Sequence, residues 1–329
     1  QHWNTLGILN PEVKTPNLDR LAARGITFTR AYTVNPTCTP TRASIITGTY
    51  PSQHGAYSLG TKLPESVPTV GDYLRDAGYR SALVGKAHFQ QLYGTDEYPS
   101  LESYPVMQDL DFWRSFSDRF YGFDHVELAR NHTAEAHVGQ HYAIWMEEKG
   151  LTNWRDYFRK PTGTKDPQKR TWNIPEEYHY DTWIAERTNA LLEQYSAAGK
   201  PFFLWSSFFD PHPSYLVPEP WDTMYDPDSL TVPSKVEGEH DRNPPHFKLT
   251  QEKNPDFSAW QEPEGNAMHG FGSHLHDKKE LAKDIAVYYG MVSLMDKYIG
   301  KILDKLEELG LAEDTLVVFT TDQIGRAHV

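Results

Sequence analysis

The chain has 329 residues, of which 38% are hydrophobic and 13% aromatic, so it can bury a sizeable core in one large domain or two ordinary ones. Its formal net charge of −13 argues against a nucleic-acid backbone as the partner, and its one cysteine excludes an intrachain disulfide. The longest apolar cluster, residues 201–209, is too short to span a membrane. An enzyme of anionic esters with this composition would need a local positive pocket inside an acidic surface.

The first expected elements are a helix and a strand. Thr15 can cap a helix over residues 15–25, Pro16 suits its first turn, and Gly25 ends it. Residues 26–32 alternate between apolar and polar side chains, which predicts a strand that leads into the following loop.

The only cysteine, Cys38, lies where that loop meets a second predicted helix. Pro40 fits the first turn of this helix, and Gly48 stops it. The side chain at position 38 therefore lies near free backbone N–H groups, which favour an anion, and Arg42 adds a fixed positive charge one turn later. From this spacing alone, a small buried thiol without a chemical role is an equally good interpretation.

The next helix and strand lead to two further polar residues. Residues 69–78 predict a capped helix, and residues 80–84 predict a short buried strand that ends just before Lys86 and His88. Active groups of α/β sheets lie at the carboxyl ends of strands, so both are candidate site residues. A solvated lysine and a loop histidine are the alternative interpretation.

A third predicted strand has the same arrangement. It follows an amphipathic helix over residues 180–198, and its apolar run over residues 201–209 is typical of a sheet covered on both faces. The run ends at Asp210 and leads to His212, which lies between two prolines and has little backbone freedom. His212 is the third candidate site residue, with a turn histidine as the alternative.

The remaining chain combines two irregular segments with a final helix and strand. Residues from about 90 to 175 and from about 214 to 276 lack regular periodicity, and we expect them to be insertions that line and cover the site. A long helix is predicted over residues 277–310, and residues 315–322 predict a strand that ends at Asp322.

Several motifs along the chain occur together in one enzyme family. The motif C-T-P-T-R begins at Cys38, and T-G-T-Y-P-S-Q-H-G follows from Thr47. With the run T-P-N-L-D-R-L-A from Thr15 and the motifs G-K-A-H and D-P-H, they resemble the type I sulfatases of the alkaline phosphatase superfamily. Thr41 stands where that family more often has serine. The resemblance implies an α/β fold, a mostly parallel sheet with helices on both faces, in a single domain over residues 1–322.

This resemblance implies a hydrolase of sulfate esters. In the family, a maturation enzyme converts the cysteine of the C-x-P-x-R motif to formylglycine, so Cys38 is the implied precursor of the nucleophile, a hydrated aldehyde whose hydroxyl attacks sulfur. Lys86, His212 and a calcium ion would stabilise charge on the sulfate oxygens. Arg42 would hold the hydrated aldehyde, and His88 would accept the proton of its second hydroxyl as sulfate is expelled.

The resemblance also implies one calcium ion, bound by Asp322 and by the formylglycine made from Cys38. Gln323 stands where the family has a histidine or asparagine ligand, and further aspartate ligands would precede Gln1. We expect residues 323–329 to be a non-native tail, because their sequence matches the translation of a common sequencing adapter. Since it lacks these ligands, we expect the chain by itself to have little or no activity.

Several alternatives of substrate and chemistry stay open. An aryl, carbohydrate or choline-type sulfate ester would each fit the resemblance. A phosphonate or phosphate ester hydrolase of the same superfamily can use the same C-x-P-x-R machinery. A cysteine–histidine hydrolase would keep Cys38 as a thiolate, and a non-catalytic binder of sulfated glycans would keep the pocket without turnover. The resemblance favours a periplasmic or secreted protein.

Overall fold

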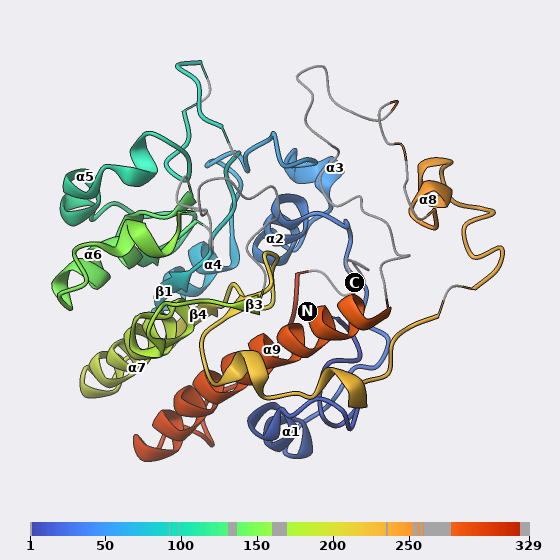
Figure 1. Ribbon diagram of the computed structural model, residues 1–329. Coiled ribbons are helices and arrows are strands. Elements are labelled where there is room, and N and C mark those ends of the chain that lie inside the picture. The colour runs from blue at the N-terminus through green and yellow to red at the C-terminus, as the bar shows by residue number, and fades with distance from the viewer. Residues whose placement is uncertain are drawn as a thin grey trace.

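The centre of the fold is a three-stranded parallel sheet (Figure 1). The computed structural model describes residues 2–91, 93–97, 99–130, 137–159, 170–234, 236–252, 256, 259 and 278–322. Within them the strand order is β2 (His125–Leu128), β1 (Arg80–Gly85) and β4 (Phe202–Ser207), and neighbouring strands run parallel. Since β1 lies between the other two, it is the central strand of the described sheet.

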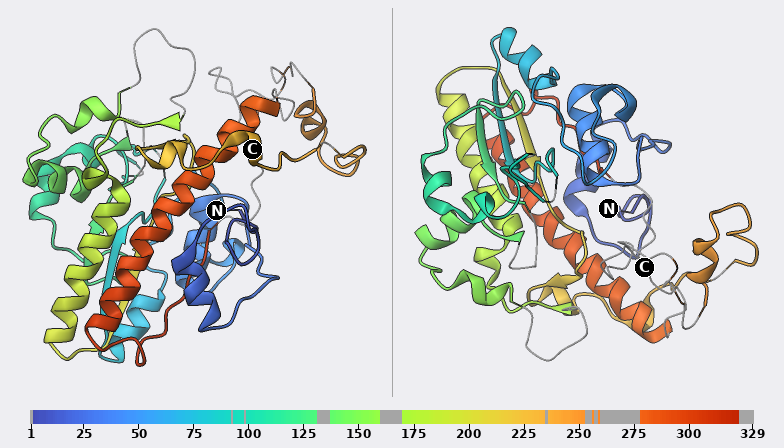
Figure 2. Two further views of the ribbon diagram at one scale, coloured as in Figure 1. Left: turned by 60° about the horizontal axis from the view of Figure 1, so that its bottom comes forward. Right: turned by 90° about the horizontal axis from the view of Figure 1, so that it is seen from above.

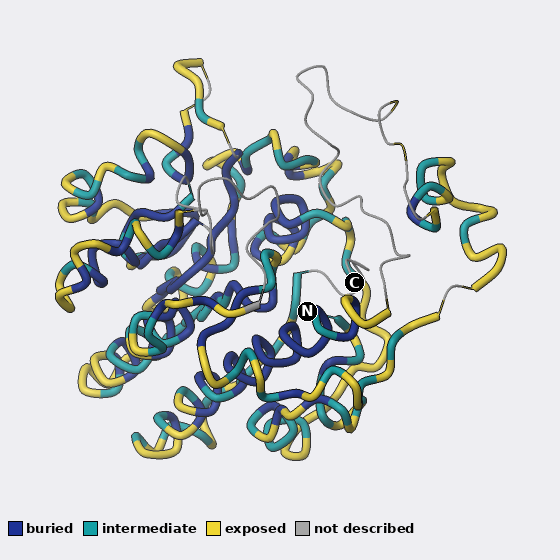
Figure 3. The backbone as a smooth tube through the Cα atoms, viewed as in Figure 1, coloured by how far each residue is buried: buried dark blue, intermediate teal, exposed yellow. Residues whose placement is uncertain are grey.

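Helices cover one face of this sheet. Alternate residues of β1 point toward that face. Ala82 and Val84 of β1 lie in a buried cluster with side chains of α6 (Gln140–Glu148) and α7 (Tyr180–Ala197). The aromatic side chains of α6 and α7, among them Trp183, make up much of this cluster. Residues of β1 and β2 are mostly buried, whereas those of β4 are mostly half-buried, and buried residues of the helices lie on the sides that face the sheet (Figure 3).

The opposite face is covered by α2 (Cys38–Thr47). Leu83 of β1 pairs in register with Val126 of β2 and with Trp205 of β4, and these three side chains share a second apolar cluster with Ile46 of α2. Successive residues of a strand point to opposite faces, so the two clusters show that both faces are packed. The expected α/β class, with helices on both faces of a parallel sheet, is confirmed.

The longest described helix, α9 (Lys278–Glu308), runs beside α7 and packs against α1 (Pro16–Ala23) (Figure 2). The buried carboxylate of Asp296 in α9 accepts hydrogen bonds from the backbone N–H groups of Asn17 (3.1 Å) and Leu18 (2.8 Å). These are N–H groups of the first turn of α1, which have no acceptor within their own helix. None of the described helices combines the length and the apolar composition needed to cross a bilayer.

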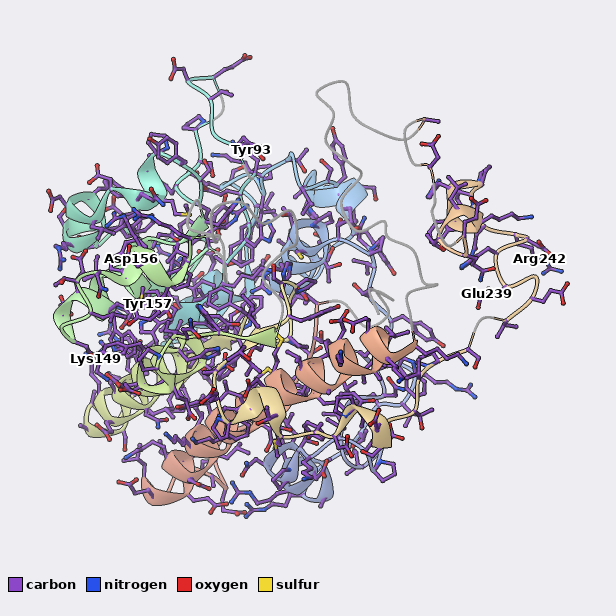
Figure 4. All side chains as sticks on the ribbon, in the orientation of Figure 1. Tyr93, Lys149, Asp156, Tyr157, Glu239 and Arg242 are labelled. Atoms are coloured by element: carbon purple, nitrogen blue, oxygen red, sulfur yellow. The ribbon has the colours of Figure 1, made fainter. Side chains whose placement is uncertain are left out.

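Shorter elements surround this core. The segment of about residues 90–175, which we expected to be an insertion, contributes β2 and α6 to the central sheet and its packing. Lys149, which follows α6 (Figure 4), pairs with Glu186 of α7 at 2.6 Å. The other described elements are α3 (Pro51–His54), α4 (Val70–Asp76), α5 (Leu110–Ser115), α8 (His246–Leu249), the parallel pair β3 (Arg170–Thr171) and β5 (Leu216–Val217), and the 3₁₀ turns η1 (Val106–Gln108), η3 (Trp154–Tyr157), η4 (Glu176–Tyr178), η5 (Trp221–Thr223) and η6 (Pro227–Ser229).

Most predicted elements are present, but two predicted strands are wrong. The helices expected at residues 15–25, 69–78, 180–198 and 277–310 correspond to α1, α4, α7 and α9. Residues 26–32 and 315–322, in contrast, pair with no described strand. Ile26 is 83% exposed and Leu316 is 89% exposed, although Val317 and Phe319 are half-buried against an apolar cluster. Alternation along a segment is insufficient for a strand, because its backbone N–H and C=O groups need a neighbouring chain. The described edge of β4 opposite β1 pairs with neither segment.

Replacing Asp296 with alanine should lower the free energy of unfolding by about 1–3 kcal/mol, because buried N–H donors of α1 would lose their acceptor. The matched control is Asp304→Ala, also on α9, which removes an exposed ion pair with Arg20 (2.7 Å) and should lower it by less than about 1 kcal/mol. Urea denaturation of both variants measures the difference. Equal losses in the two variants would contradict the role given to Asp296.

Candidate active site

Cys38 is the first residue of α2 and follows Thr37, whose backbone is extended. The cysteine is 7% exposed, and Nζ of Lys86 lies 3.7 Å from its Sγ atom. Lys86 is itself buried, at the carboxyl end of β1. The sequence-predicted pair is therefore brought together, and the ammonium group adds to the positive potential of the helix N-terminus.

The guanidinium of Arg42, one turn along α2, connects the parts of the site. Its Nε donates to the carbonyl oxygen of Ala87 (2.7 Å), and its Nη2 donates to Oγ of Ser207 (2.6 Å). Nη2 also donates to the carbonyl oxygen of Lys86, and Nη1 lies 3.2 Å from the carboxylate of Asp322. One buried side chain thus joins α2 to the carboxyl ends of β1 and β4 and to the end of the described chain.

Glu102 holds the loop that follows β1. Its carboxylate, with the residue 1% exposed, accepts hydrogen bonds from three consecutive backbone N–H groups, those of His88 (2.5 Å), Phe89 (2.8 Å) and Gln90 (2.9 Å). Arg130, which lies just beyond β2, pairs with the same carboxylate at 3.7 Å. Hydrogen bonds to an ionised acceptor are stronger than neutral ones, so this contact fixes the loop firmly.

His88 is held in an unusual conformation by this loop. Its φ of +57° lies in the left-handed region, which is unfavourable for a residue other than glycine. The ring is buried, and neither ring nitrogen has a hydrogen-bond partner within the described part of the chain. Burial and the positive charges of Arg130 and Lys86 lower the pKa of His88 well below its usual value. The imidazole is therefore neutral near pH 7 and able to accept a proton.

His212 follows β4 and is half-buried. With Lys86, Arg42 and Asp322 it lines a cavity of about 1020 Å³. Much of the remaining lining comes from residues 201–209 and 314–321, which are mainly apolar. The cavity is therefore mainly the space between β4, α9 and residues 314–321, and Lys86, Arg42, His212 and Asp322 lie at its end near the carboxyl ends of β1 and β4.

Asp322 is the expected metal ligand that the structure describes. Burial raises its pKa, but the positive charges of Lys86 and Arg42 outweigh this and lower it to about 2, so the carboxylate is ionised. An ionised carboxylate close to Lys86, which itself contacts Cys38, fits a hard cation such as calcium, which takes six to eight oxygen ligands. Gln323 lies outside the described residues, and Asp322 with an oxygen at position 38 would make up only part of that ligand set.

Sequence reasoning missed Glu102, Arg130 and Ser207. Glu102 and Arg130 lie in a segment without periodicity, and each resembles an isolated surface charge when its neighbours in space are unknown. Ser207 is the last residue of β4 and was predicted only as part of an apolar strand. Ser207 meets Arg42 because β4 pairs with β1, whereas Glu102 meets residues 88–90 through the fold of the loop after β1, and Arg130 reaches Glu102 from the end of β2.

Comparison with protein families identifies the class of the chain. A model of the sulfatase family matches residues 1–327. The chain belongs to the sulfatase family. This family is part of the alkaline phosphatase superfamily, as the resemblance predicted.

Individual sulfatase-family relatives differ in what their names say of activity. The chain is 29% identical over 350 residues to the multifunctional alkaline phosphatase superfamily protein PehA of Trinickia caryophylli, covering 97% of this chain and 59% of the relative. It is 26% identical over 318 residues to an arylsulfatase of Clostridium perfringens, covering 95% of this chain and 58% of the relative. The chain thus spans less than two thirds of the length of these relatives.

A solved structure supports the sulfatase-family fold. The phosphonate monoester hydrolase of Agrobacterium radiobacter matches with a TM-score of 0.69 and 24% identity, over 98% of this chain and 60% of that chain. This likeness concerns the α/β fold, and it agrees with the parallel sheet and the helices on its two faces.

Replacing Glu102 with glutamine should speed hydrogen exchange at the amides of residues 88–90 by about tenfold or more, because a neutral amide offers one acceptor oxygen in place of two charged ones. Exchange followed by NMR or mass spectrometry measures the effect. The control is Glu65→Gln, which removes an exposed pair with Lys62 and should leave these amides unchanged. Unchanged exchange in the Glu102 variant would show that this carboxylate does not hold the loop.

Proposed function

We propose that the protein hydrolyses sulfate esters with a formylglycine made from Cys38. The placement of Lys86 Nζ 3.7 Å from the Cys38 sulfur, at the N-terminus of α2 and within a sulfatase-like motif, is the observation that supports this most directly. The family membership and the arylsulfatase relative support the reaction class. Aryl, carbohydrate and choline-type sulfates are the candidate substrates.

Lys86 and His212 bind the sulfate group in this proposal. The hydrated aldehyde at position 38 supplies the hydroxyl that attacks sulfur. Lys86 donates to a sulfate oxygen from the end of β1, and His212 donates from the end of β4. Both residues line the same cavity near the carboxyl ends of their strands, and in this proposal negative charge develops on sulfate oxygens that they contact. Donors that are held in place before the reaction usually lower the barrier of such a step more than any other single effect.

His88 and Arg42 complete the chemistry of the chain's own residues. His88 accepts the proton of the second hydroxyl at position 38, because its imidazole is neutral and both ring nitrogens lack partners among the described residues. This proton transfer drives the release of sulfate. The resemblance implies that Arg42 holds the hydrated aldehyde, but its Nε and Nη2 already donate to protein acceptors, so we propose that Arg42 acts chiefly by holding α2 against the loop that carries Lys86.

Calcium is the metal we propose for the site. Asp322 and an oxygen at position 38 would hold it, and when bound it would polarise the sulfate oxygens. The other ligands of the expected set, at residue 323 and before Gln1, lie outside the described residues.

A phosphonate or phosphate ester hydrolase is the second candidate. The name of the PehA relative describes that protein as multifunctional. Lys86 and His212 could contact phosphonate or phosphate oxygens in the same way as sulfate oxygens, because both are donors that recognise an anionic oxygen.

Mass spectrometry of the peptide that contains Cys38 tests the nucleophile. In protein coexpressed with a formylglycine-generating maturation enzyme, we expect a peptide lighter than the thiol form, because an aldehyde replaces the thiol side chain. Cys38→Ala provides the inactive control. An unmodified thiol in a protein that still cleaves sulfate esters would contradict the proposal and favour a thiol hydrolase.

Kinetics of Lys86→Met test the anion-binding role in the protein at its natural length. We expect kcat/KM for an aryl sulfate to fall by about 10²–10³-fold, the usual loss when a donor to the developing charge is removed. Lys62→Met, at a half-buried lysine paired with Glu65, should leave kcat/KM unchanged. A higher kcat/KM for a phosphonate monoester than for the sulfate would support the second candidate, and tight glycan binding without turnover would indicate a binder.

A further inference from the structure

A second polar cluster lies at the start of α7 and the end of β4. It consists of His179, Asp181 and Asp210, and one potential ligand atom from each lies within 4.8 Å of the other two. His179 and Asp181 are fully buried, and Asp210 is 6% exposed. None of the three belongs to the proposed sulfate-binding group, although Asp210 precedes Pro211 and His212.

The cluster lacks a compensating positive charge. Within the described part of the chain, no lysine or arginine pairs with Asp181 or Asp210. Burial raises the pKa of Asp210 to about 7 and raises that of Asp181 well above its usual range. Burial also lowers the pKa of His179 to about 3, so its imidazole is neutral. Two buried carboxyl groups beside a neutral ring need either protons or a cation.

The hydrogen-bond partners of the cluster favour a cation over a shared proton. Oδ1 of Asp210 accepts from the hydroxyl of Tyr180, whereas its Oδ2 has no hydrogen-bond partner among the described residues. Asp181 and Asp210 lie within hydrogen-bonding reach of each other when one of them is protonated. Apart from that contact, neither carboxyl oxygen of Asp181 nor Nε2 of His179 has a hydrogen-bond partner among the described residues. One proton shared between the carboxyl groups would satisfy a single oxygen on each and leave Asp181 with an unpaired oxygen. A metal ion bound to one atom of each side chain could also contact that second oxygen of Asp181.

We propose that His179, Asp181 and Asp210 bind one divalent cation of the class that accepts mixed nitrogen and oxygen ligands, such as Zn²⁺ or Mn²⁺. Nδ1 of His179 and Oδ2 of Asp181 lie 3.9 Å apart, whereas ligand atoms of a tetrahedral site with bonds of about 2.1 Å lie about 3.4 Å apart. Nδ1 now accepts a 3.2 Å hydrogen bond from the backbone N–H of Asp181, so binding through Nδ1 would replace that bond and binding through Nε2 would keep it. The ligand atoms, which lie within 4.8 Å of one another, would need to approach by up to about 1.4 Å.

Such an ion would also stabilise the turn that carries His212. Asp210 ends the run that begins with β4, and His179 caps α7, so the ion would tie the strand to the helix directly ahead of His212. This site is separate from the calcium site proposed at Asp322 and uses a different set of ligands.

The experiment is metal titration of the full chain carrying Cys38→Ala, so that neither a thiol nor a formylglycine can contribute a ligand. Calorimetry with Zn²⁺ and with Mn²⁺, in two buffers of different ionisation enthalpy, should show one bound ion and a release of protons, because the carboxyl groups must be ionised to coordinate. Because Cys38 is absent, the result is independent of the proposed hydrolysis.

Variants of the cluster give the decisive comparison. Asp181→Asn should raise the Kd for the metal by about 100-fold or more. Loss of a residue that only hydrogen-bonds a metal ligand already raises the Kd by about 10–100-fold, and Asp181 would be a ligand itself. Asp322→Asn is the matched control and should leave the Kd within about twofold. His179→Gln provides a second ligand variant if circular dichroism shows that Asp181→Asn is unfolded.

Three outcomes would overturn the proposal. The first is that the Asp181 and His179 variants bind the metal as strongly as the Cys38→Ala protein does. The second is binding that is lost only in Asp322→Asn. The third is absence of a bound ion together with higher stability of Asp181→Asn, as expected for carboxyl groups that share a proton.

Discussion

The geometry of the site depends on the buried guanidinium of Arg42. Its planar set of donors reaches the carbonyls of Lys86 and Ala87, the hydroxyl of Ser207 and the carboxylate of Asp322. A lysine could not serve these acceptors together, because its ammonium group is a point charge with three donors. Since Arg42 lies one turn after Cys38 on the same helix, these contacts set the distance between the sulfur and Lys86. A change at Arg42 would leave several buried acceptors unpaired.

Two carboxylates, those of Glu102 and Asp322, pair with the arginines of the site and leave the ammonium group of Lys86 near position 38. Glu102 pairs with Arg130 behind the loop, and Asp322 pairs with Arg42. Lys86 forms no ion pair among the described residues, and its ammonium group faces the Cys38 sulfur. The acidic chain thus keeps one buried cation available at the place where an anionic ester would bind, while the arginines act mainly on the backbone.

The parallel sheet explains why these groups meet. Because β1, β2 and β4 are parallel, their carboxyl ends lie at the same end of the sheet. The chain continues from these ends to Lys86, Arg130 and His212, respectively. The N-terminus of α2 brings Cys38 to the same end. The cluster of His179, Asp181 and Asp210 adjoins it where α7 begins. Both polar centres therefore depend on the end of β4, and a change in the Asp210–His212 turn would affect the two together.

The sequence by itself determined the local features. Caps, prolines and glycines placed Cys38 at a helix N-terminus, and apolar runs placed Lys86, His88 and His212 after strands, because these signals lie within a few neighbouring residues. Alternation failed for residues 26–32 and 315–322, since a strand also requires a partner that no local pattern specifies. Only the tertiary structure decided that Glu102 holds the loop of His88 and that Asp181 meets Asp210. Such contacts join residues that are separated in sequence. Burial then shifts the pKa values of these residues, and the amino-acid composition does not show which residues are buried.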